Sequence, residues 1–288
     1  MKVILSRKGF DKSAGGYPSP HLVDSGRLIS FPIPEDEKVN TCIRYSDLSF
    51  DQDNSYLDLM EQLGIKKYSK STIAHLDPDI NASVIPRNHS QWRGIFGQSS
   101  AAQSHLSRKN IQVGDLFLFF GWFKDAVRTA AGYRYVNGTH KHVIWGYMQV
   151  GEIEQIDKAG KYDTWKLSHS HYMYRDREMN TAYISPATLS FNSDIPGCGA
   201  FNYSESLVLT QKDQQKRSVW KLPSFFHPDM GTRTSYHENI FSKSGKKVWE
   251  LNDDHCILNS VGRGQEFVVE GNEEVEKWAK ELIQQQFI

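Results

Sequence analysis

The chain has 288 residues with 34 basic and 34 acidic side chains, so its formal net charge is zero. A neutral chain has no overall field that holds it on DNA or an anionic membrane, and any contact with nucleic acid needs a local patch. The chain has three widely spaced cysteines, Cys42, Cys198 and Cys256, which argue against a disulfide framework or a cysteine zinc site. The absence of a signal sequence or a membrane-length apolar run predicts a cytoplasmic protein with no membrane contact.

The chain opens with a short apolar run, Val3-Ile4-Leu5, which predicts a strand that ends at the two cations Arg7 and Lys8. A glycine pair follows, and glycine lets backbone N–H groups approach a ligand closely. Cations beside such a turn are typical of an anion-binding loop. The block predicts a nearby phosphate or nucleotide, with these substrate-binding residues: Arg7, Lys8, Gly15, Gly16 and Ser19.

The remaining pattern indicates many strands and a few helices. Helical spacing of apolar residues, or a capping residue followed by helix formers, predicts helices over residues 56–63, 99–108 and 273–286, the last of them amphipathic. Further strands are expected over residues 27–31, 181–184, 206–209 and 266–269, with Pro32-Ile33-Pro34 ending the first of these.

An aromatic run over residues 116–123 predicts a buried central strand. The next strands, 133–136 and 142–153, are expected to pair in sequence around an Asn137-Gly138 turn. We therefore expect an α+β fold: a β-rich mixed sheet or partly closed barrel with a few flanking helices and a carboxy-terminal amphipathic helix. One compact unit over residues 1–288 is expected, and a division near residue 110 is the alternative.

Two segments carry candidate reactive groups. Asp77 and Asp79 lie beside His75, and paired carboxylates divide acid and base roles, bind a divalent cation, or simply stabilise a turn. Gly97 leads into the second predicted helix, whose amino terminus favours an anion. Gln98, Gln103 and His105 offer donors and acceptors for a base edge or a sugar hydroxyl, although a capped helix with polar residues facing water explains them equally well.

Histidines and aromatic residues supply the other candidates. In His140-Lys141-His142 and His169-Ser170-His171, a strand would present both imidazoles on one face, toward an ion or a phosphate. Stacking, hydrogen bonding and plain surface positions are the alternatives, so we predict no metal site and name no cofactor. Trp122 and Trp145 lie beside strand glycines and are the candidates for stacking on a base, with His142 as a further substrate-binding residue.

Three of these segments together resemble a known family. They are the opening block through Pro34, Phe96-Gly97-Gln98 with the helix that follows it, and the strand from Gly114 to Phe123. They resemble the third type of nucleotide modification associated domain, which was proposed in bacteria and phages from its association with DNA-modifying enzymes. The resemblance covers most of the chain and implies work on nucleotides or modified DNA bases in modification or defence, without implying a reaction.

A weaker resemblance lies inside the chain. Gly114-Asp115 leading an aromatic strand, and a later strand ending in Tyr147 to Ile153, look like the small β-barrels of the PUA and ASCH kind. That resemblance implies RNA binding or the reading of modified bases.

Two functions remain open at this stage. The first is an enzyme acting on a nucleotide or DNA base, in which the cations of the opening block hold phosphate and the catalytic candidates are Asp11, Asp77 and His105. The second is a non-catalytic reader of an extruded or modified base. DNA is favoured over RNA as the nucleic-acid partner. The neutral charge favours the enzyme, since a reader of duplex DNA needs a basic stripe.

Overall fold

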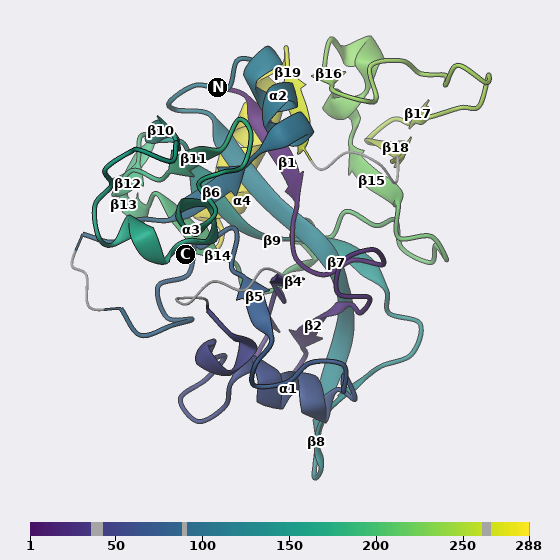
Figure 1. Cartoon of the computed structure of the whole chain (residues 1–288). Helices are drawn as coiled ribbons and strands as arrows, with labels where there is room; N and C mark the ends of the chain where they lie inside the picture. Colours follow the sequence, from purple (N-terminus) through teal and green to yellow (C-terminus); the bar gives the residue numbers. More distant parts are fainter. Residues whose placement is uncertain (36–42, 88–90, 261–265, 288) are drawn as a thin grey trace.

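The computed structural model describes residues 1–35, 43–87, 91–260 and 266–287, so Cys42 lies outside the described residues. Within them, nine strands form a mixed sheet that curls into a half-barrel (Figure 1). These strands are β1 (Val3–Arg7), β2 (Ser19–Leu22), β3 (Arg27–Leu28), β7 (Leu116–Thr129), β8 (Gly132–Tyr135), β9 (Lys141–Gln149), β14 (Cys198–Ala200), β16 (Arg233–Thr234) and β19 (Glu266–Glu270). The predicted α+β fold with a curled sheet is confirmed.

Smaller sheets surround this half-barrel. Two of them have three strands: β10 (Glu152–Gln155), β11 (Thr181–Ile184) and β6 (Ile95–Gln98); and β15 (Val219–Pro223), β18 (His255–Asn259) and β17 (Trp249–Leu251). Two further pairs are β12 (Thr188–Leu189) with β13 (Asn192–Pro196), and β4 (Ile33–Glu35) with β5 (Ile73–His75).

The α-helices are α1 (Tyr56–Gln62), α2 (Ser100–Arg108), α3 (Ser170–Met173) and α4 (Glu273–Gln284). The predictions of α1, α2 and α4 are confirmed. Two of these helices begin at a local signal: Ser55 forms a capping box with Asp58 at the start of α1, and the Asn272 side chain caps α4. Short 3₁₀ helices cover Tyr45–Asp47, Lys166–Ser168, Glu205–Leu207, Ser224–Phe226 and Pro228–Met230. In the described part of the chain, no helix combines the length and apolar character that a membrane crossing requires.

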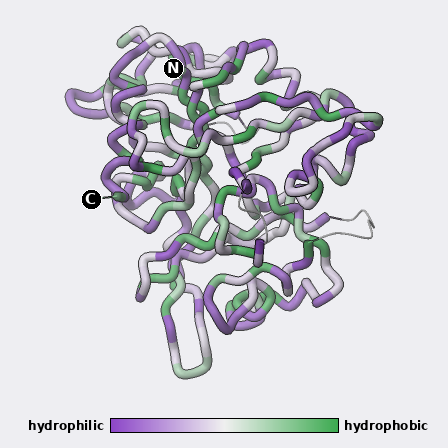
Figure 2. Tube along the Cα trace, turned by 90° about the vertical axis from the view of Figure 1, so that its left-hand side faces the viewer, coloured by the Kyte–Doolittle hydropathy of each residue, from purple (hydrophilic) through white to green (hydrophobic). Residues whose placement is uncertain are grey.

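The central strand is β7, as the aromatic run predicts, and it extends beyond the predicted end to Thr129. It pairs with β1 and β2 in parallel and with β8 and β9 in antiparallel. Residues 116–120 lie in one hydrophobic cluster together with the apolar face of α4, and Ala126 lies in a second cluster that includes α1. Figure 2 shows hydrophobic segments running through the interior of the molecule, while many of the outer loops are hydrophilic.

Four local strand predictions are wrong. The hairpin between β7 and β8 closes at residues 130–131, and β9 pairs with β7, so Asn137-Gly138 lies in a connection and closes no hairpin. The predicted strand 142–153 divides at Gly151, where a side chain would collide with the backbone of Pro186. Residues 205–207 form a 3₁₀ helix, and Pro34 lies within β4, where a two-stranded ribbon tolerates a missing N–H.

The first strand brings its cations to the middle of the sheet. β1 lies between β7 and β19, with Arg7 opposite Phe120 and Ser6 opposite Glu266. Lys8 follows directly and its N–H donates to the Phe120 carbonyl at 2.8 Å. The sheet thus fixes where Arg7 and Lys8 leave the core.

Candidate functional site

Two cavities meet at the end of β1, and Arg7, Asp11 and Ser13 line both of them. The first has a volume of about 380 Å³. Its other lining residues are Lys8, Gly9, Ala14, Ile33, His75, Asp77, Gln98, Ser99, His171 and Arg177. The second has a volume of about 450 Å³, and its other lining residues are Lys12, Trp122, His142, Gln215, Lys216, Arg217 and Ser218.

The shared wall is a tight loop organised by Asp11. Asp11 Oδ1 accepts hydrogen bonds from the N–H and hydroxyl of Ser13, at 2.7 and 2.8 Å, and from the Ala14 N–H at 2.8 Å. Gly15 and Gly16 have φ of +88° and +87°, which glycine adopts without strain, and Gly15 lies against the Phe10 ring. The glycine pair therefore shapes the loop and does not itself line either cavity.

Lys8 and Gln98 reach the first cavity but are held by a buried carboxylate. Lys8 Nζ lies 3.1 Å from Glu266 Oε1, and Gln98 Nε2 donates to the same oxygen at 2.7 Å. Lys8 Nζ also lies 4.4 Å from the centre of the Phe96 ring. Glu266 was missed by sequence reasoning, although a lone acidic residue opening the apolar run 267–269 is a usable signal.

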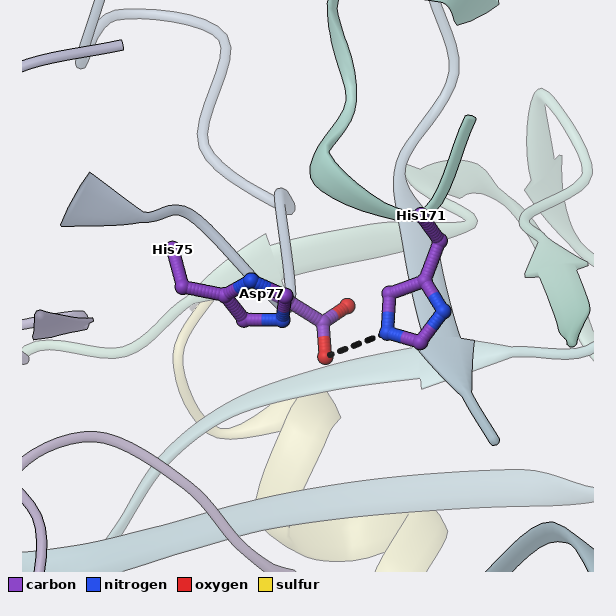
Figure 3. Close-up of side chains that lie close together, drawn as sticks. All are labelled: His75, Asp77 and His171. Carbon is purple, nitrogen blue, oxygen red and sulfur yellow. Dashed lines mark ion pairs between the residues drawn. The ribbon is translucent and has the colours of Figure 1, made fainter. Parts of the chain in front are cut away.

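Asp77 is the buried carboxylate of the first cavity. Its Oδ1 accepts the Gly97 N–H at 2.6 Å and lies 3.3 Å from His169 Nε2. Its Oδ2 lies 4.0 Å from His171 Nε2 (Figure 3). Burial alone would raise the pKa of Asp77, but the contact with His169 and electrostatic interactions with the neighbouring histidines and Lys8 lower it below its usual value, so the group is ionised at neutral pH.

His171 is held against Gly97, where a Cβ atom would lie 2.2 Å from two atoms of the imidazole ring. Burial lowers the pKa of His171 to about 3, so the ring is neutral at physiological pH. His75, from β5, lies with its ring centre 5.5 Å from that of His171. Figure 3 shows the two imidazoles on either side of the Asp77 carboxylate. His75, Asp77 and His171 each offer a ligand atom within 4.8 Å of the others.

Asp79, the second candidate carboxylate, lies outside both cavities. Asp79 pairs with Arg87 at 2.5 Å and lines a separate small cavity. Burial raises the pKa of Asp79, whereas that of Asp77 is lowered. The two carboxylates of the turn therefore have different surroundings and do not share one site.

The two His-x-His segments do not adopt the expected strand geometry. His169 precedes the short helix α3, and its Nδ1 accepts the backbone N–H of His171 at 3.3 Å. Both imidazoles nevertheless approach Asp77. His140 lies outside β9, and His140 and His142 each accept an indole N–H at 2.9 Å, from Trp122 and Trp220. Hydrogen bonding explains this second pair.

The second cavity is cationic. It is lined by four basic side chains, Arg7, Lys12, Lys216 and Arg217, and by Asp11. Burial lowers the pKa of both arginines, which are partly desolvated. Arg217 stacks on the ring of Trp122 at 4.3 Å. Within the described ranges, no ion pair holds Lys12, Lys216 or Arg217, so their charge faces the cavity without a fixed counter-ion.

Besides the glycine pair, four predicted site residues line neither cavity. The hydroxyl of Ser19 accepts the Phe31 N–H at 3.0 Å, and Gln103 accepts the Tyr183 hydroxyl at 3.1 Å. His105 lies 3.2 Å from the Ser235 hydroxyl, and Trp145 lines the small cavity beside Asp79. Their predicted functional roles stay predictions.

The comparisons with known proteins give one match. A family model described as nucleotide modification associated domain 3 matches residues 2–270, which is nearly the whole chain. No curated protein and no solved structure shows a significant match. The likeness to PUA and ASCH barrels therefore stays a prediction.

Proposed function

Because this chain belongs to the nucleotide modification associated domain 3 family, we propose that its paired cavities bind one nucleotide, free or within a nucleic acid, and catalyse a change to its base or sugar. The phosphates lie in the second cavity, and the reacting part of the nucleotide lies beside Asp77 and His171 in the first. The observation that carries this proposal is the shared wall: Arg7, Asp11 and Ser13 line a cationic cavity on one side and the Asp77–His171 group on the other.

The charges of the second cavity suit phosphate. Four basic side chains face one carboxylate there, and that carboxylate is already engaged by the Asp11 loop. Guanidinium groups bind phosphate through two parallel hydrogen bonds, and partial burial strengthens the attraction. Because the chain has zero net charge, contact with nucleic acid needs a local cationic patch, and the second cavity is such a patch.

The first cavity favours an enzyme over a reader. A reader needs cations and stacking surfaces. Burying an ionised carboxylate beside a neutral imidazole costs folding free energy, and base binding alone does not require such a pair. Groups with strongly perturbed pKa values cluster at reactive sites. Asp77 and His171 both have such values and line the same cavity.

Binding is tested by calorimetry and thermal shift with nucleoside mono-, di- and triphosphates and with short single-stranded DNA and RNA. We expect Lys12→Gln and Arg217→Gln each to weaken binding about tenfold, the loss of one charge-assisted contact. Lys158→Gln is the control, because Lys158 is exposed and pairs with Asp176 away from both cavities. Equal affinity of all three variants for every ligand would place the nucleotide elsewhere.

Mass spectrometry of the recovered nucleotide or oligonucleotide separates the two functions. A mass change that is lost in Asp77→Asn supports the enzyme. Retardation of an oligonucleotide without any mass change supports the reader. The choice between DNA and RNA, and the setting in bacterial or phage DNA modification, stay predictions that matched oligonucleotides and the neighbouring genes test.

A further inference from the structure

We propose that His75, Asp77 and His171 bind a divalent first-row transition-metal ion at the wall of the first cavity. This inference goes beyond the proposed function and does not depend on it, since it rests on the closeness of the three ligand atoms and on the contacts that orient the three side chains. Each of them turns one unshared electron pair toward a common centre.

The orientation of His171 follows from Asn180. The Asn180 amide nitrogen donates to the carbonyls of His171 and Tyr174, at 2.9 and 3.2 Å. Its oxygen is therefore the atom that lies 2.6 Å from His171 Nδ1, and an oxygen there only accepts. The ring proton is thus on Nδ1, and Nε2 presents its lone pair toward Asp77.

Asp77 adds a second acceptor facing the first. Its Oδ1 accepts the Gly97 N–H and lies 3.3 Å from His169 Nε2, which makes no aligned hydrogen bond in the described part of the chain. His169 Nδ1 accepts a backbone N–H, so in the neutral ring the proton is on Nε2. Oδ2 remains, 4.0 Å from the lone pair of His171 Nε2. Two buried acceptors that face one another repel unless a positive centre lies between them, and a metal ion that binds both would remove this repulsion.

His75 completes the set from the other side. Its Nδ1 makes no aligned hydrogen bond within the described residues but lies 3.0 Å from Glu35 Oε2, and this ion-pair contact favours a ring proton on Nδ1, with Nε2 as the electron-pair donor. Metal-binding histidines commonly donate their other ring N–H to a carboxylate or an amide oxygen in this way. Glu35 and Asn180 therefore occupy the positions of supporting partners for His75 and His171.

The donor set indicates the class of metal. Two imidazoles and one carboxylate suit iron, zinc or manganese, and three ligands leave coordination positions open. A metal held about 2.0–2.2 Å from each ligand needs the ligand atoms about 3–4 Å apart, so a small contraction of the observed cluster is sufficient. The open positions face the cavity, since all three residues line it.

The test measures metal directly, without nucleotide. The full chain is stripped with a chelator, dialysed against Fe(II), Zn(II) or Mn(II) under exclusion of oxygen, and analysed for bound metal. Co(II) is used in parallel because its visible absorption reports coordination by imidazole and carboxylate. We expect one equivalent of at least one of these ions, and a Co(II) spectrum that disappears in Asp77→Asn and in His171→Gln.

Two further variants separate ligand loss from unfolding. Glu35→Gln keeps the three ligands and is expected to weaken affinity about 10- to 100-fold, as loss of a supporting partner does. His227→Gln is the matched control, because His227 is also buried beside a carboxylate, 3.6 Å from Asp229, and is expected to retain full occupancy. Circular dichroism checks that each variant is folded.

Two outcomes overturn the inference. The first is a folded wild-type chain that binds none of the four ions in stoichiometric amount. The second is equal occupancy in the wild type and in folded Asp77→Asn and His171→Gln variants, which would place the ion elsewhere. Either result leaves the nucleotide-binding test of the second cavity unaffected, because that test uses Lys12 and Arg217.

Discussion

One methyl group at Gly97 tests the geometry of the site most sharply. In Gly97→Ala the new Cβ would lie 2.2 Å from the His171 ring, whereas ordinary contacts begin at 3.4 Å. The ring, or the strand, must therefore move by about 1.2 Å, the difference between these distances. Gly97 does not have a left-handed φ, so the effect is steric and not conformational.

The structure gives the size of both effects. Crowding a packed interior costs about 1–3 kcal/mol of the free energy of unfolding. A shift of 1.2 Å also removes the 2.6 Å hydrogen bond from His171 to Asn180, or drags Asn180 with it. We therefore expect a folded, moderately destabilised protein that loses at least about tenfold in ligand affinity at the first cavity, because site geometry tolerates little displacement.

Urea unfolding measures the first effect, and metal and nucleotide titrations measure the second. Gly146→Ala is the matched control: its Cβ would meet Ile80 at 2.5 Å and the Gly199 carbonyl at 2.9 Å, away from both cavities. It should lose stability and keep its ligands. A Gly97→Ala protein with unchanged stability and full binding would refute the assigned packing of His171.

Other consequences of the fold are accessible to simpler measurements. Lys8→Met should destabilise the protein by about 3–5 kcal/mol in urea unfolding, because it leaves Glu266 buried without its cation. The double variant Lys8→Met with Glu266→Gln should recover much of the lost stability. Equal losses in the single and the double variant would contradict the pairing of Lys8 with Glu266. Burial lowers the pKa of His142 well below that of the unfolded chain, so the contribution of this residue to stability is full above about pH 6.5 and falls at up to about 1.4 kcal/mol per pH unit as the pH drops below it. Replacing His142 with Gln should reduce the acid slope of the whole protein by the share of this residue, since His171 contributes in the same direction, and an unchanged slope would exclude His142 as a source. Asn272→Ala should cost about 1–2 kcal/mol in thermal unfolding, because the side chain caps α4 and also donates to two carbonyls; a change below a few tenths would show that solvent replaces the cap.

The parts of the fold that the sequence predicts are those with local causes. The run from Leu116 to Phe123 is apolar on every residue but one, and only a central strand or a buried helix accommodates such a run. Which strands flank it was not predictable, because its partners include Val3 on one side and Met148 on the other. The misplaced Asn137-Gly138 hairpin has the same origin, because a turn signal predicts where the chain bends but not which strand the following strand pairs with.

The candidate site divides in the same way. Arg7 and Asp77 were predicted because each lies in a distinctive local segment, after an apolar strand and beside a histidine and a proline. His171 was noticed only as half of a His-x-His pair, and its position beside Asp77 depends on Gly97, a strand residue 74 positions earlier in the sequence. No periodicity connects such residues, since packing alone brings them together.

The pairing of β19 with β1 has a consequence for biosynthesis. Glu266, which neutralises Lys8 in the interior, leaves the ribosome more than two hundred residues after it. Until β19 has been synthesised, one edge of β1 has no partner strand and Lys8 has no counter-charge, so β1 gains its final environment only after translation has passed β19. A chain interrupted before β19 would carry every lining residue of both cavities and still lack Glu266, which holds Lys8 and Gln98 in place.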